Sequence, residues 1–280
     1  MTTSPARGGP PLEGFGQFFF ESHGMGYPVY HAGKQGDPML LLLQEIAGFS
    51  PGLLLFAERL TGAGFQVAVP WLFGPFGRRA PVRNAIRLCV SREFANLREG
   101  VSAPVATWLR ALAAQLSKRN GGARIGAIGM CLTGAFAIPL VIEPGVAAAV
   151  AAQPSVPLSF LHLAFGTGDP ERLGALNVAD ATIAEARARL NTGEAHMLAV
   201  RCRADRICPR AKLERFMREF PVGLDVREYG NADDRNRVGQ RPHATYTKEY
   251  RIEPDAPAEH HSRQAFADLV AFFDRYLRVS

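Results

Sequence analysis

The sequence predicts an α/β fold with a mainly parallel central sheet flanked by helices. Short apolar runs of strand length alternate along the chain with longer segments of helical apolar spacing. Such alternation is typical of parallel sheets with right-handed crossovers. Hydrophobic residues make up 47% of the 280 residues, which is enough for a sizeable core. Folds of this class commonly reach this length as one domain.

The first elements follow one another closely. Residues 27–31 alternate weakly and predict an edge strand. The continuous apolar run 39–44 is typical of a central strand covered on both faces. We expect a helix over 53–61, ended by glycines, and a buried strand over 65–70 that proline stops. Residues 71–83 are rich in Gly, Pro and Arg and predict a loop.

The middle of the chain repeats the same alternation. Helical spacing over 102–118 precedes an apolar strand at 125–128, a helix of small and apolar residues at 134–142, and a short strand at 146–151. The segment 153–190 is irregular at first and helical at its end. We expect it to be an insertion or lid near the functional site.

The last elements are the clearest. Residues 196–202 and 224–229 predict strands on either side of a helix at 210–220. Residues 263–277 carry apolar side chains on one face and predict an amphipathic closing helix.

The two ends of the chain define the expected domain. The first residues have no apolar segment of the kind a signal peptide needs. We therefore expect a flexible leader over 1–22 and a single domain over 23–280. No run of 18 apolar residues predicts a membrane span. Four cysteines are too few for a disulfide framework, so reduced thiols in the cytoplasm are the simplest expectation.

The charge pattern favours a small-molecule partner. The net charge is +6, but the arginines are mixed with acidic residues, as on solvated helix faces. Neither a zinc-finger spacing nor a helix-turn-helix or RNP signature is visible, so we expect no nucleic-acid partner. The positive charge would attract an anionic substrate. We expect a monomer or a small homo-oligomer.

The most informative residue is Cys131. It lies at the turn between the strand 125–128 and the helix 134–142. This is the pattern of a nucleophile elbow, with cysteine in place of serine. Gly129 and Gly134 leave room for a sharp turn and close packing, and a helix N-terminus favours thiolate. The alternative is a buried structural cysteine.

Two later residues could complete a catalytic set with Cys131. Asp205 follows a predicted strand, His243 follows the last one, and nucleophile, acid and histidine stand in the order of a hydrolase triad. His243 would take the thiol proton, and Asp205 would fix its tautomer and orientation. Alternatively, Asp205 caps a helix or closes a turn, and His243 is simply exposed.

Glu45 lies at the carboxyl end of the early apolar strand, where active residues of such sheets gather. A carboxylate after four leucines is costly to bury without a partner, so we expect a functional role. The backbone N–H of Leu132 would be one donor to an oxyanion. The second would come from the loop around Ile46.

The chain resembles the dienelactone hydrolase family of α/β-hydrolases. Four segments carry the resemblance: 43–48 (LQEIAG), 129–134 (GMCLTG), 204–209 (ADRICP) and 242–245 (PHAT).

The resemblance implies roles for individual residues. Cys131, Asp205 and His243 would form the triad, and Glu45 would contact the nucleophile and take part in its substrate-dependent activation. It also implies hydrolysis of esters or lactones through an acyl-thioester, without a metal or organic cofactor.

The chain departs from the archetypal members in the groups that bind the substrate. These members hold the substrate carboxylate with arginines, one of them four residues after the histidine, where this chain has Thr247. Arg92, Arg206 and Arg241 could substitute, and the sequence does not select among them. Two alternatives to a general ester or lactone hydrolase stay open: a true carboxymethylenebutenolidase acting on dienelactone, and a silent hydrolase-like binding protein.

Overall fold

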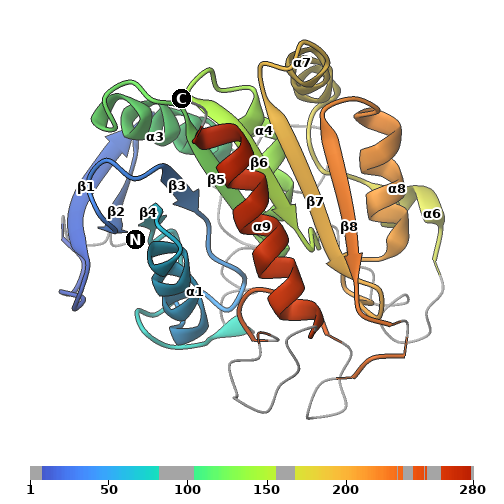
Figure 1. Cartoon of the computed structure of the whole chain (residues 1–280), viewed down its shortest axis with the longest axis horizontal. Helices are drawn as coiled ribbons and strands as arrows, with labels where there is room; N and C mark the ends of the chain where they lie inside the picture. The colour runs from blue at the N-terminus through green and yellow to red at the C-terminus, as the bar shows by residue number, and fades with distance from the viewer. Residues whose placement is uncertain are drawn as a thin grey trace.

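Eight strands form one sheet in the described part of the chain (Figure 1). The computed structural model describes residues 8–81, 104–155, 168–231, 233–235, 242–248, 250 and 260–278. The strands lie in the order β1-β2-β4-β3-β5-β6-β7-β8. The pairs β1–β2 and β2–β4 are antiparallel, and every pairing from β4 to β8 is parallel. The prediction of a mainly parallel sheet is confirmed.

The element bounds follow the predicted alternation. The strands are β1 (Gly16–Ser22), β2 (Met25–Ala32), β3 (Met39–Leu42), β4 (Gln66–Pro70), β5 (Ile125–Met130), β6 (Val146–Ala152), β7 (His196–Cys202) and β8 (Leu224–Tyr229). The helices are α1 (Pro51–Gly62), α3 (Pro104–Arg119), the 3₁₀ helix η2 (Cys131–Phe136), α4 (Ala137–Val141), α6 (Pro170–Gly174), α7 (Asp180–Asn191), α8 (Arg210–Glu219) and α9 (His261–Leu277).

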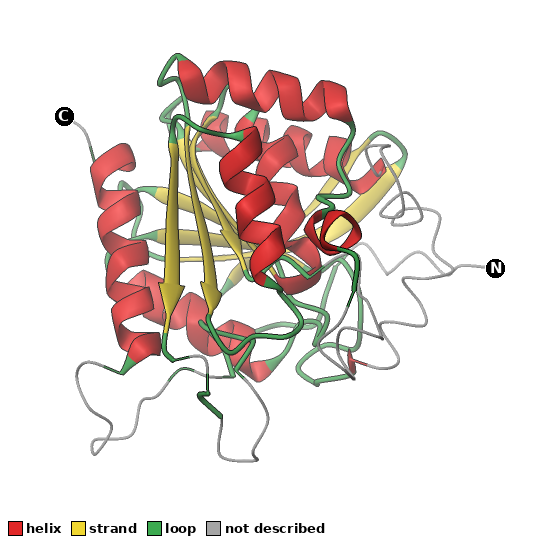
Figure 2. Cartoon of the chain, turned by 90° about the vertical axis from the view of Figure 1, so that its right-hand side faces the viewer, coloured by secondary structure: helices red, strands yellow, loops and turns green. Residues whose placement is uncertain are grey.

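Helices cover both faces of the sheet, as the edge-on view shows (Figure 2). α1 and α9 pack on one face, and α3, α4, α7 and α8 pack on the other. β3 shows why the central strands are apolar throughout. Its side chains alternate between the two faces, so Leu41 enters one core while Leu40 and Leu42 enter the other.

The prediction of a flexible leader over 1–22 is wrong for its last seven residues, because Gly16–Ser22 form β1. β1 pairs with β2 along its whole length, so β2 is an inner strand and not the edge. Phe18 and Phe20 pack against the core, and Phe20 meets the Trp108 ring edge-on at 5.3 Å. The apolar run of three phenylalanines is the signal that identifies this strand.

The expected insertion over 153–190 is a crossover at its C-terminal end. α7 links β6 to β7 and buries Ile183, Ala186 and Leu190 in the core, as a crossover helix does. Residues 156–167 lie outside the described part of the chain. The single domain over 23–280 stays a prediction.

The helix predicted over 134–142 is replaced in the structure by two shorter elements. A 3₁₀ helix starts at Cys131, and the α-helix after it has only five residues. The helix dipole at the thiol is therefore weaker than the sequence suggests, because a macrodipole needs aligned α-helical turns. Across the described residues, no helix combines the length and apolar character that crossing a membrane would require.

Candidate active site

Cys131 lies at the carboxyl end of β5, where the strand turns directly into η2. Its φ is +55°, a left-handed value that few residues other than glycine adopt. The side chain is buried and 5% exposed. A non-glycine residue held in this conformation at the end of a central strand is typical of a nucleophile elbow.

Two glycines make the sharp turn at Cys131 possible. A Cβ on Gly129 would lie 2.2 Å from the backbone oxygen of Thr133. A Cβ on Gly134 would lie 2.8 Å from Cα of Pro154. Both neighbours are backbone atoms, which cannot move aside as a flexible side chain can. The glycines therefore let η2 fold back onto its own strand and onto the segment after β6.

Asp205 and His243 are in direct contact. Nδ1 of His243 lies 2.6 Å from Oδ2 of Asp205. The other carboxylate oxygen, Oδ1, accepts the backbone N–H groups of Ile207 at 2.8 Å and Cys208 at 3.0 Å. The Asp205 side chain is 1% exposed. Both carboxylate oxygens are therefore engaged, and the turn after β7 aims one of them at the imidazole.

The electrostatic setting of His243 favours its protonated form. Burial by itself lowers the pKa of His243, but the Asp205 carboxylate and the Cys131 sulfur together hold that pKa well above its usual range. Nε2 of His243 is buried and has no hydrogen-bond partner among the described residues. The Cys131 sulfur is near enough to influence the ring, so Nε2 is available to exchange a proton with it.

Glu45 follows β3 and is held by neutral donors. Oε2 accepts from Oγ1 of Thr247 at 3.0 Å, and Oε1 accepts from Nε2 of Gln153 at 3.3 Å. Burial raises the pKa of the Glu45 carboxyl, and the charges of His243 and Arg79 together with these hydrogen bonds offset only part of that rise. No hydrogen bond joins Glu45 to the Cys131 thiol in the described residues.

The two expected oxyanion donors lie on segments that the structure ties together. Leu132 is in the first turn of η2, where backbone N–H groups have no earlier intrahelical partner. Ile46 directly follows Glu45 and packs against the core. Oγ1 of Thr133 donates to the backbone oxygen of Gln44 at 3.1 Å. This bond links the turn at Cys131 to the loop that carries Ile46.

Besides Gln153, two residues that the sequence reasoning missed contact the site. Oγ of Ser155 lies 3.3 Å from Sγ of Cys131. Arg201, buried in β7, donates to the backbone oxygens of Cys208 at 2.8 Å and of Asp205 and Arg203 at 3.1 Å. Arg201 thereby organises the turn that holds the acid. The sequence signal for Arg201 is the presence of an arginine inside an otherwise apolar predicted strand.

The structure describes one of the three arginines that could bind a substrate carboxylate. The hydroxyl of Thr247 is engaged with Glu45, so this position supplies no cation. Arg206 is exposed. Arg92 and Arg241 lie outside the described residues.

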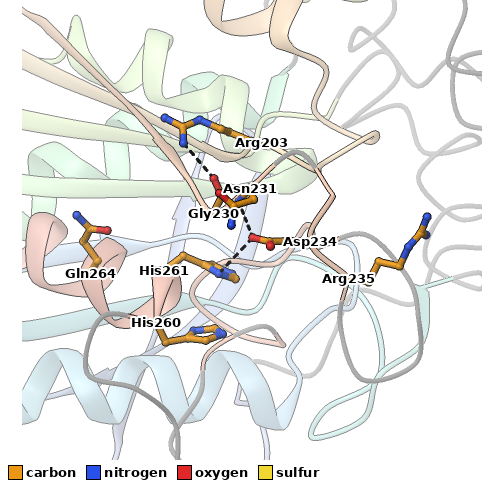
Figure 3. A pocket seen from close by; sticks show the side chains of 8 residues that line it. All are labelled: Arg203, Gly230, Asn231, Asp234, Arg235, His260, His261 and Gln264. Carbon is orange, nitrogen blue, oxygen red and sulfur yellow. Dashed lines mark hydrogen bonds and ion pairs between the residues drawn. The ribbon is translucent and has the colours of Figure 1, made fainter.

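A separate hollow of about 500 Å³ lies beyond the Asp205 turn (Figure 3). It contains none of the residues that gather at Cys131. In it, Nη1 of Arg203 donates to the backbone oxygen of Gly230, and His261 lies 3.9 Å from Asp234. Throughout the described ranges, no three His, Cys, Asp or Glu side chains are grouped so that they could hold a metal ion.

The model of the dienelactone hydrolase family matches residues 27–217. Among curated proteins, none matches the chain significantly.

Several solved structures share the fold over nearly the whole chain. A putative dienelactone hydrolase from Klebsiella pneumoniae is 18% identical with a TM-score of 0.62, covering 94% of this chain and 98% of its own. A dienelactone hydrolase from Anabaena variabilis is 15% identical with a TM-score of 0.57, covering 95% and 100%. A dienelactone hydrolase-like promiscuous phosphotriesterase from metagenomic libraries is 15% identical with a TM-score of 0.58, covering 92% and 97%. At these identities the likeness shows the α/β-hydrolase fold.

Proposed function

The chain belongs to the dienelactone hydrolase family, and from this premise we propose that it is a cysteine-dependent hydrolase of esters or lactones that works through an acyl-thioester. The family makes it a hydrolase of small-molecule substrates. The nucleophile, the intermediate and the site residues are the proposed part. The observation that carries the proposal is the buried 2.6 Å contact between His243 and Asp205 beside a cysteine held at positive φ.

The first half of the reaction acylates Cys131. Nε2 of His243 takes the proton of the thiol, and the sulfur forms a bond to the substrate carbonyl carbon. The backbone N–H groups of Leu132 and Ile46 would donate to the developing oxyanion. When the carbonyl re-forms, the ester C–O bond breaks, and the leaving alcohol takes the proton from His243.

The second half releases the acid. His243 takes a proton from water, the water oxygen attacks the thioester carbon, and the C–S bond breaks. The thiol recovers its proton from His243. Asp205 supports the charged imidazolium in both halves, since it is hydrogen-bonded to Nδ1 throughout.

Glu45 has a supporting role in this proposal. Its carboxyl is buried among neutral donors, and burial raises its pKa. It therefore holds its proton to higher pH than a surface carboxylate does. We assign it to activation of the nucleophile, as the family resemblance implies.

Thr247 favours a general ester or lactone substrate over dienelactone itself. A carboxylate-bearing lactone needs a cation at the site. The position four residues after His243 supplies none, because the hydroxyl of Thr247 is bound to Glu45, and the charge of Arg79 already acts on that same carboxyl. Kinetics on matched lactones with and without a carboxylate would separate the two candidates. Equal or better turnover of the uncharged lactone is expected, and a strong preference for the carboxylate would favour a true dienelactone hydrolase.

The nucleophile is tested by replacing Cys131 with alanine. We expect Cys131→Ala to fold normally and to lose p-nitrophenyl ester and lactone hydrolysis. Cys202→Ala is the matched control, because Cys202 is another buried thiol at the end of a strand. Wild-type turnover by Cys131→Ala would refute the assignment of Cys131 as the nucleophile.

A free thiol nucleophile also suits a reducing compartment such as the cytoplasm, and we propose that location.

A further inference from the structure

Ser155 is held against the proposed nucleophile by two hydrogen bonds. Its hydroxyl oxygen lies 3.3 Å from the sulfur of Cys131. Its backbone N–H donates to the backbone oxygen of Cys131 at 3.1 Å. Ser155 is 3% exposed and Cys131 is 5% exposed. Within the described ranges, the Cys131 sulfur is the one hydrogen-bond partner of this hydroxyl.

The two residues before Ser155 are each anchored to the fold. The backbone N–H of Gln153 donates to the backbone oxygen of Val200 at 2.7 Å, which continues the β6–β7 pairing. Pro154 packs so closely on Gly134 that a Cβ there would lie 2.8 Å from its Cα. Ser155 therefore stands at a defined place relative to the sulfur.

The direction of the bond depends on the protonation state of the sulfur. A neutral thiol can donate to the hydroxyl or accept from it. A thiolate can only accept, so the hydroxyl of Ser155 must then be the donor. Hydrogen bonds to an ionised partner are about twice as strong as bonds between neutral groups. The contact therefore stabilises the thiolate more than the thiol.

We infer that Ser155 is a further catalytic residue. It donates a hydrogen bond to the Cys131 thiolate and so increases the fraction of the protein in which Cys131 is ionised. Its effect on turnover rests on the proposed function, since it assumes that this sulfur attacks the substrate. The proton leaves Sγ for Nε2 of His243, and the electron pair that remains on sulfur accepts the Ser155 hydrogen bond.

Other titratable groups belong to the same site, and no hydrogen bond in the described residues joins any of them to the Ser155 hydroxyl. His243 lies across the site, with Asp205 behind it. Glu45 is fixed by its own hydrogen bonds. Burial raises the pKa of the Cys208 thiol well above its usual range, so it remains neutral. A change on removing the hydroxyl therefore reports on the Ser155 bond.

The test is the pH dependence of Cys131 alkylation by iodoacetamide, followed by peptide mass spectrometry in wild type and Ser155→Ala. Loss of the bond should move the midpoint up by about one pH unit, equivalent to about 1.4 kcal/mol. A more basic thiolate is also intrinsically more nucleophilic, with a Brønsted slope of about 0.4–0.5. The rate should therefore fall about threefold below the midpoint and rise about threefold above it.

Two variants control for unrelated effects. Ser117→Ala removes another buried serine hydroxyl, which donates to the backbone oxygen of Ala123 in a different part of the fold. It should keep the wild-type profile. Ser155→Thr retains a hydroxyl and should keep the wild-type midpoint. Ser155→Gly removes the hydroxyl as well and serves if the alanine variant fails to fold.

An unchanged midpoint in both hydroxyl-deleted variants would overturn the inference. A labelling rate lowered equally at every pH would also overturn it, because that is the result of a merely structural change. Acylation of Cys131 by p-nitrophenyl acetate tests the proposed function separately. If wild-type Cys131 is acylated but the alkylation midpoint of Ser155→Ala is unchanged, only the role of Ser155 is refuted. If the midpoint moves but wild-type Cys131 is not acylated, only the hydrolase mechanism is refuted.

Discussion

Replacement of Asp205 by asparagine isolates the charge of the acid from its shape. Asparagine can still accept the N–H groups of Ile207 and Cys208 through Oδ1. Its amide group would then face Nδ1 of His243, where the carboxylate oxygen now lies at 2.6 Å. The imidazole must accept there, so its proton moves to Nε2, the atom that should take the thiol proton. We expect kcat/KM to fall about 10³–10⁴-fold.

The same change has a pH-dependent cost in stability. A buried hydrogen bond to a charged group contributes about 1.5–3 kcal/mol. Because the folded pKa of His243 is raised, its contribution is fully present below the ordinary histidine value and is lost as pH rises through the raised value. The difference in unfolding free energy between wild type and Asp205→Asn should therefore be largest below the ordinary histidine pKa of about 6.5 and should shrink as the solution becomes alkaline.

Esterase kinetics and urea unfolding, each over a series of pH values, measure these two effects. Asp234→Asn is the matched control, since Asp234 lies 3.9 Å from His261 in an exposed hollow. It should change neither quantity appreciably. Activity of Asp205→Asn within threefold of wild type, or a stability difference that does not vary with pH, would refute the reasoning.

Two further substitutions test the parts of the site around the sulfur. Glu45→Gln should lower kcat with little change in KM. Its stability relative to wild type should also grow as pH rises above the ordinary glutamate pKa, because burial raises the Glu45 pKa and the neutral amide avoids burying a charge. Equal kinetics, or a stability difference in urea unfolding that does not change with pH, would make Glu45 purely structural. Gly129→Ala should cost about 2 kcal/mol or more, since its Cβ would meet the Thr133 backbone oxygen at 2.2 Å. Thermal unfolding checks this, with Gly62→Ala as the control because a Cβ on Gly62 would have no atom within 4 Å. Equal melting temperatures of the two variants would count against a crowded elbow.

The sequence predicted those features of the fold that are local. Each central strand is a continuous apolar run, so its burial on both faces was visible before its neighbours were known. The turn at Cys131 was visible because Gly129 and Gly134 are needed within a few residues of it. β1 was missed although its partner β2 follows after a two-residue turn, because the Trp108 ring that covers Phe20 lies far along the chain.

The contacts within the site depend on how separate segments meet. Ser155 lies 24 residues from Cys131 along the chain and reaches the sulfur only because Pro154 packs onto Gly134. Thr247 reaches Glu45 across 202 residues. Neither pairing has a sequence spacing that could indicate it. Residue types and chain order could therefore nominate the site, whereas its hydrogen bonds required the fold.

Intact-protein mass spectrometry after a brief reaction with p-nitrophenyl acetate tests the central claim most directly. The wild-type protein should gain one acetyl group, about 42 Da, as the expected acyl-enzyme. Cys131→Ala should gain none. Hydrolysis of the ester by the wild type without any adduct on Cys131, or the same adduct on Cys131→Ala, would contradict an acyl-thioester at this residue.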